Sequence, residues 1–189
     1  MGELNLVLGG ARSGKSTFAQ QLAQELGDGG QVLFVATAQA GDKEMRQRIE
    51  KHRQERPANW DTLEVQRDIG QAIVAHSANA KVILIDCVTM LVSNLLMNIR
   101  DLSFAETETQ VVTEIQGLMD CIKATPGTFI VVSNEVGLGL VPPYSLGRTY
   151  RDLLGRANQI LAREADAVHF LVAGIPLLIK GVAHSRNNR

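Results

Sequence analysis

The chain has 189 residues, of which 45% are hydrophobic and 21% are charged, and its formal net charge is -1. A chain of this length and apolar content can bury a sizeable core, and we expect one α/β domain over residues 1–189. The balanced charge argues against nucleic acid or acidic membranes as general partners, and no apolar run is long enough to span a bilayer.

The first predicted element is a buried strand, LNLVL at 4–8, which leads through GGARSGKST into a predicted helix at 15–26. This apolar run is too short for a signal peptide, so we expect a cytoplasmic protein. Between the strand and the helix, four residues match the phosphate-binding pattern G-x-x-x-x-G-K-[ST]: Gly9, Gly14, Lys15 and Ser16.

This glycine-rich segment is suited to hold the phosphates of a nucleoside triphosphate. Its glycines let successive backbone N–H groups face an anion, and the helix N-terminus adds positive potential. Lys15 supplies a mobile charge for the outer phosphates, and Ser16 is placed to bind Mg²⁺. Arg12 is either a further phosphate contact or a solvated side chain. The plain structural alternative is a glycine turn before an amphipathic helix.

A second buried strand, VLFVA at 32–36, is followed by the densely charged segment DKEMRQRIEKHRQERPANW at 42–60. On spacing alone, residues 42–55 form a solvated helix. Met45, Ile49 and His52 recur at i, i+4 and i+7, which places His52 at the edge of an apolar stripe. A solvated helix and a nucleophilic histidine are both compatible with this pattern.

A predicted helix at 68–76 leads to a third buried strand, VILID at 82–86, which ends in Asp86. A carboxylate in this position can hold Mg²⁺ directly or through water, together with Ser16; the alternative is that Asp86 caps the next predicted helix, at 89–97. The only cysteines are Cys87 and Cys121, and they have no ligand spacing. Neither a disulfide framework nor a zinc site is therefore expected.

The last third of the chain continues the alternation of helix and strand. It carries a predicted helix at 105–123, a strand at 129–133, an irregular loop, a long helix at 146–164 and two close strands at 167–174 and 175–180. This order predicts a mostly parallel sheet covered on both faces, with ligand sites at the carboxyl ends of its strands. The two final strands are expected to form a hairpin at one edge.

Six segments, in order, resemble the bifunctional adenosylcobinamide kinase/adenosylcobinamide-phosphate guanylyltransferase family over nearly the whole chain. They are GGARSGKS, ATAQ, RIEKHRQERPANW, DCVTMLVSNLL, SNEVGLGLVP and RTYRDLLGRANQILA. The resemblance implies a P-loop NTPase with a RecA-like sheet, assembled as a homotrimer. It also implies a corrinoid acceptor, ATP and GTP as substrates, and Mg²⁺.

The resemblance implies two reactions. One passes a terminal phosphoryl group to the hydroxyl of adenosylcobinamide. In the other, a histidine takes GMP from GTP, releases pyrophosphate and hands GMP to adenosylcobinamide phosphate. His52 occupies the guanylylated position and is preceded by Lys51, where some members carry a second histidine.

The resemblance also assigns site residues. His52 and Lys15 would be catalytic, and Ser16 and Asp86 would hold the metal, although members carry either Asp or Glu at the latter position. The nucleotide-binding residues would be Gly9, Gly10, Ala11, Arg12, Ser13, Gly14, Lys15, Ser16, Thr37, Ala38, Gln39, Arg53, Gln54, Glu55, Arg56, Glu64 and Asp86.

Two other functions fit the P-loop alone. A monofunctional small-molecule kinase would leave His52 idle. A RecA-like nucleic-acid ATPase would need a basic groove or stacking aromatic side chains, and the chain has one Trp, two Tyr and five Phe.

Overall fold

The computed structural model describes residues 1–39, 46–47, 50, 53, 56–77, 79–98 and 103–181. The described elements alternate between strand and helix over most of the chain, as predicted. In order they are β1 (Glu3–Gly9), α1 (Lys15–Gly27), β2 (Val32–Ala36), β3 (Asp61–Glu64), α3 (Ile69–His76), β4 (Val82–Asp86), α4 (Val88–Asn98), α5 (Phe104–Ala124), β5 (Thr128–Val132), α6 (Ser145–Glu164), β6 (Ala167–Val172) and β7 (Ile175–Lys180).

The seven strands form one sheet in the order β3-β2-β4-β5-β1-β6-β7. Every neighbouring pair is parallel except β6 and β7, which form the antiparallel hairpin that the sequence predicts at one edge. The strand at the other edge, β3, is not predicted from the sequence. Its four residues, DTLE, are mostly exposed and carry a single large apolar side chain, so they show no buried run.

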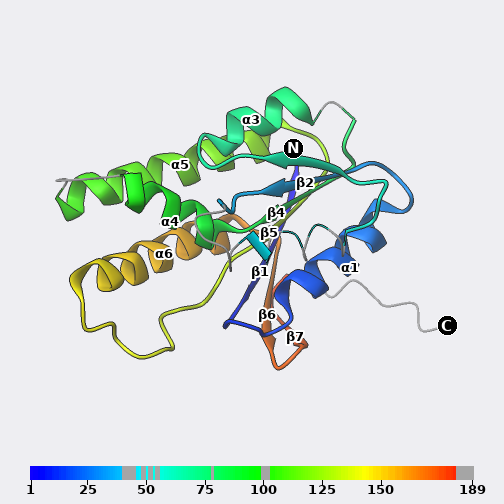
Figure 1. The fold of residues 1–189 in the computed structure, drawn as a ribbon. Coiled ribbons are helices and arrows are strands. Elements are labelled where there is room, and N and C mark those ends of the chain that lie inside the picture. Colours follow the sequence, from blue (N-terminus) through cyan, green and yellow to red (C-terminus); the bar gives the residue numbers. More distant parts are fainter. Residues whose placement is uncertain are drawn as a thin grey trace.

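Side chains from alternate strand positions enter two separate cores, one on each face of the sheet. In β4, Ile83 and Ile85 join the core formed with α3, α4, α5 and α6, whereas Val82 and Leu84 join the core formed with α1. Figure 1 shows this division, with α1 on one side of the sheet and α4, α5 and α6 on the other. Burying one such side chain stabilises the fold by about 1.5–3 kcal/mol.

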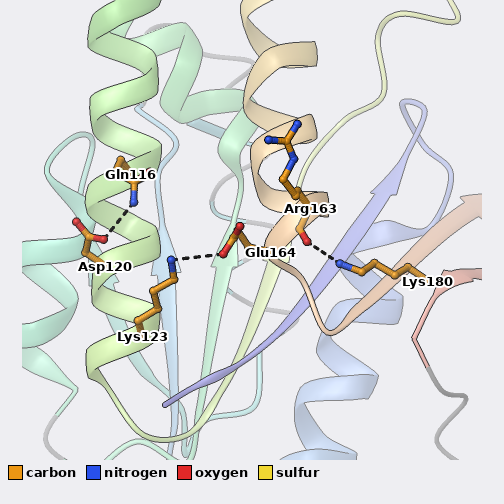
Figure 2. Close-up of polar contacts among 6 residues, drawn as sticks. All are labelled: Gln116, Asp120, Lys123, Arg163, Glu164 and Lys180. Carbon is orange, nitrogen blue, oxygen red and sulfur yellow. Dashed lines mark hydrogen bonds and ion pairs between the residues drawn. The ribbon is translucent and has the colours of Figure 1, made fainter.

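Polar contacts connect α5, α6 and β7 at the end of the sheet where the parallel strands begin (Figure 2). Lys123 of α5 pairs with Glu164 of α6 at 3.4 Å. The Lys180 ammonium of β7 donates to the carbonyl oxygens of Ala162 and Arg163 at 3.0 and 2.7 Å, which satisfies acceptors in the last turn of α6.

The first five strands all run in the same direction. The segments that follow them therefore lie together at the other end of the sheet, where these strands finish. No helix in the described part of the chain is long and apolar enough to cross a membrane.

Candidate active site

The P-loop, residues 9–16, connects β1 to α1 and needs glycine at two positions. Gly14 has a φ of 91°, and a Cβ there would lie 3.2 Å from Gly174 Cα. A Cβ on Gly9 would lie 2.7 Å from the Leu171 carbonyl oxygen. The loop is also tied to the β6–β7 turn, because the Gly174 N–H donates to the Ser13 carbonyl at 2.9 Å. The hairpin thereby braces the phosphate-binding loop.

Lys15 is the first residue of α1, and its side chain turns back towards the P-loop. Its Nζ donates to the Gly10 carbonyl oxygen at 2.6 Å, and only 8% of the residue is exposed. Burial lowers the pKa of Lys15, while the nearby Cys87 and Asp86 oppose that shift. The ammonium therefore lies inside the phosphate-binding loop, bonded to its backbone.

A cavity of about 840 Å³ opens beside the P-loop at the carboxyl ends of the strands. The predicted site residues that line it come from the P-loop, the segment after β2, the charged segment, β3 and β4: Ala11, Arg12, Lys15, Ser16, Ala38, Gln39, Arg53, Arg56, Glu64 and Asp86. Gly9, Gly10, Ser13 and Gly14 shape the loop without lining the cavity.

Four further predicted residues are not among those that line this cavity. Thr37 has no exposed surface and lies behind the cavity wall. His52, Gln54 and Glu55 lie outside the described residues, as do Met45, Ile49 and most of the predicted helix at 42–55. Glu50 and Arg53, the described residues on either side of position 52, both have helical backbone and both line the cavity.

The structure adds lining residues that the sequence did not single out, among them Phe34, Gln66, Cys87, Met90 and Asn134. Three of these residues, Gln66, Cys87 and Asn134, lie one or two positions beyond the ends of β3, β4 and β5. The rule that ligands bind at strand carboxyl ends would have found them. No local sequence signal points to Phe34, which lies within a buried strand.

Arg56 is stacked on Phe34, with the guanidinium carbon 3.7 Å from the ring centroid. Burial lowers the pKa of Arg56, and Arg53 adds to that shift, whereas Asp86 and Glu64 oppose it. Its Nε is buried and has no hydrogen-bond partner among the described residues. Arg53 forms an ion pair with Glu64 on the same wall. Both guanidinium groups line the same cavity as Arg12 and Lys15, which suits an anionic ligand.

Cys87 is not a thiolate nucleophile. Burial, with a smaller contribution from the Asp86 charge, raises the pKa of Cys87 to about 12, so the thiol stays protonated near neutral pH.

The residues present fit Mg²⁺ with a nucleotide better than a protein-only metal site. In the described ranges, no cluster of three or more His, Cys, Asp or Glu side chains is able to hold a metal ion. The Ser16 hydroxyl and the Asp86 carboxylate both line the cavity. One or two hard oxygen ligands are the set Mg²⁺ takes from a protein when phosphates and water complete its octahedron.

Residues 5–179 match the family model described as cobinamide kinase / cobinamide phosphate guanyltransferase. The chain belongs to this family. It is 41% identical over 177 residues to the bifunctional adenosylcobalamin biosynthesis protein CobP of Pseudomonas aeruginosa, covering 94% of this chain and 97% of that one. It is 42% identical over 181 residues to CobU of Salmonella typhimurium, covering 93% of this chain and 98% of the relative.

Solved structures with low sequence identity show the same fold. The flagellar accessory protein FlaH of Methanocaldococcus jannaschii aligns with a TM-score of 0.51 at 15% identity, covering 95% of this chain and 78% of that one. A solved ATPase domain aligns with a TM-score of 0.54 at 14% identity, covering 95% of this chain and 77% of that one. These likenesses confirm the predicted RecA-like P-loop fold.

Membership in the family also decides between the functions that the P-loop left open. The chain is a bifunctional enzyme, a cobinamide kinase and cobinamide phosphate guanylyltransferase. The monofunctional kinase and the nucleic-acid ATPase are set aside.

Proposed function

We propose that both reactions use the nucleoside triphosphate bound in this one cavity and that His52 carries the guanylyl group between donor and acceptor. The observation that carries the proposal is that Glu50 and Arg53, which flank position 52 in the chain, line the same cavity as Lys15. The charged segment and the P-loop therefore contribute to one site. The relatives named above are adenosylcobalamin biosynthesis proteins, and we assign this chain to the same pathway.

For the kinase step, alignment and charge neutralisation are sufficient, because the transferred phosphoryl group needs no covalent partner on the protein. The P-loop N–H groups and Lys15 hold the β- and γ-phosphates, while Arg53 and Arg56, which line the same cavity, neutralise further charge. Ser16 and Asp86 would hold Mg²⁺, which when bound would neutralise negative charge on the phosphates. The hydroxyl oxygen of adenosylcobinamide then forms a bond to the γ-phosphorus and loses its proton to solvent, while the β–γ bond breaks and the nucleoside diphosphate leaves with the electron pair.

For the guanylyl step, a neutral imidazole nitrogen of His52 attacks the α-phosphorus of GTP. A P–N bond forms and the bond to the pyrophosphate oxygen breaks, so that pyrophosphate leaves with the electron pair. A phosphate oxygen of adenosylcobinamide phosphate then attacks the same phosphorus, which breaks the P–N bond and returns His52 to its neutral form. Dividing the transfer in this way replaces one difficult step by two easier displacements.

We also propose that ATP or GTP serves the kinase step, that only GTP serves the second step, and that the chain works in the cytoplasm as a homotrimer. The resemblance supports the trimer, and light scattering at working concentrations tests it by giving a mass three times that of the 20.5 kDa chain.

A competition experiment tests the shared cavity. A GTP analogue with non-hydrolysable bridges at both the α–β and β–γ positions should inhibit the kinase reaction run with ATP and the guanylyl reaction run with GTP, with inhibition constants that agree within about threefold. Inhibition of only one reaction at saturating analogue would show that the two reactions use separate nucleotide sites.

A further inference from the structure

Thr37, the first residue after β2, forms three hydrogen bonds to the end of β4. Its backbone N–H donates to the Asp86 carbonyl oxygen at 3.3 Å. Its hydroxyl donates to the Cys87 carbonyl oxygen at 2.7 Å and accepts from the Cys87 N–H at 2.8 Å. One side-chain oxygen therefore bonds to both backbone groups of Cys87, whose carbonyl also accepts from the Leu91 N–H at 3.2 Å.

A second buried side chain supports Thr37 from α4. The Asn94 amide donates to the Thr37 carbonyl oxygen at 2.8 Å and to the Gln66 carbonyl oxygen at 3.4 Å. Thr37 has no exposed surface and Asn94 is 7% exposed, and neither lines the cavity. Their partners Gln66 and Cys87 do line it. The pair thus ties together the segments that follow β2, β3 and β4 from behind the cavity wall.

We infer that Thr37 is a positioning residue that fixes the Asp86–Cys87 segment relative to the P-loop, rather than a ligand of the nucleotide. The inference rests on the proposed role of Asp86 in holding Mg²⁺. Without the hydroxyl, the Cys87 N–H would lose its partner in a buried place and the Cys87 carbonyl would keep only the Leu91 N–H, so the segment would have to move to satisfy the N–H. The Asp86 carboxylate would then be displaced from the position it needs beside Ser16.

The test compares Thr37→Val, which removes the hydroxyl at nearly constant shape, with Thr37→Ser, which keeps it. Thr107→Val is the matched control, because Thr107 is a buried threonine whose hydroxyl donates only to the Ser103 carbonyl within its own helix. All variants are made in a Cys121→Ala background, so that Cys87 is the only thiol.

The first readout does not depend on activity and measures the rate at which iodoacetamide alkylates Cys87 in the nucleotide-free protein. The second is the Mg²⁺ concentration that gives half of the maximal kinase rate. We expect T37V to raise both quantities about 10-fold. For the Mg²⁺ requirement, this is the lower end of the usual effect of removing a residue that orients a metal ligand. T37S and T107V should stay within about threefold of the parent.

Wild-type values for both readouts in T37V would overturn the inference. A rise in the nucleotide KM of T37V with an unchanged Mg²⁺ requirement would also overturn it, because a direct ligand of the nucleotide gives that result. If T37V does not fold, Asn94→Ala takes its place: faster alkylation of Cys87 supports the inference, and an unchanged rate overturns it. Asp86→Asn separates the two claims. An unchanged Mg²⁺ requirement in D86N would refute the proposed role of Asp86, whereas the alkylation rates would still report on Thr37.

Discussion

The Arg56 guanidinium lies over the ring of Phe34, 3.7 Å from its centroid, and this contact joins the charged segment to the second strand of the sheet. A cation over an aromatic face is worth about 0.5–2 kcal/mol, more when desolvated. The contact holds a cation at the cavity that Lys15 also lines. The geometry explains how a segment that looks like a solvated helix contributes a side chain to the cavity.

We therefore expect Arg56→Lys to weaken GTP binding about 3- to 30-fold, because lysine keeps the charge but loses the planar stacking surface. Phe34→Leu should have a similar effect. Isothermal titration with GTP and Mg²⁺ measures it. Arg151→Lys is the matched control, since that guanidinium binds the Gly137 carbonyl away from the cavity. An R56K protein that binds GTP as tightly as the parent would show that the stacked geometry is dispensable.

Lys15→Met should lower the rates of both reactions by about 100-fold or more, because one charge-stabilising donor is lost in each transition state. Rapid-quench assays with ATP for the first reaction and GTP for the second give the two rates, and urea unfolding checks that the protein is folded. Loss of only one activity would contradict a shared phosphate-binding loop.

Gly14→Ala should destabilise the protein by about 1–3 kcal/mol, because alanine at a φ of 91° is strained and its Cβ would press on Gly174. Gly155→Ala is the control. Its added Cβ meets no atom within 4 Å, and alanine in α6 should stabilise by about 0.5–1 kcal/mol. Urea unfolding of the three proteins measures both effects, and equal stabilities would show that the conformation at Gly14 relaxes freely.

The raised pKa of Cys87 predicts a loss of stability at high pH. The folded thiol keeps its proton up to a pKa of about 12, whereas the pKa of an unperturbed thiol is 9.0. Above pH 9 the unfolded chain therefore binds fewer protons than the folded one, and the free energy of unfolding falls as pH rises towards 12. The fall approaches about 1.4 kcal/mol per pH unit for this group.

Comparing the parent with Cys87→Ser isolates this contribution, because the other titrating groups are common to both proteins. The stability difference between them should be constant below pH 8 and should shift in favour of C87S between pH 9 and 10.5. Parallel stability curves across that range would mean that the thiol ionises as easily in the folded protein as in the unfolded chain.

The parts of this molecule that the sequence predicts are those specified by neighbouring residues. The P-loop is one continuous pattern, and the central strands are uninterrupted apolar runs, so both were predicted correctly. β3 was missed because DTLE is an exposed edge strand held by pairing with β2, which no run of apolar residues reveals. The hairpin of β6 and β7 was predicted, because its two strands are adjacent in the chain.

The roles of Thr37 and Phe34 depend on contacts between distant parts of the chain. Thr37 meets Cys87 fifty residues later, and Phe34 meets Arg56 across the connection from β2. A polar residue directly after a strand is expected to face a ligand, and only the fold shows that the Thr37 hydroxyl turns inward to the neighbouring strand end. Side-chain direction at a strand end is set by the pairing of strands, which the local sequence does not encode.

The central claim is that the chain carries GMP covalently on His52, and labelling with GTP that is radioactive at the α-phosphate tests it most directly. We predict a protein-bound label that is stable in alkali and labile in acid, maps to the peptide containing His52 and disappears in His52→Ala while kinase activity remains. An unlabelled wild-type protein that still forms the GDP-linked product, or an H52A protein that does so at the wild-type rate, would contradict the account.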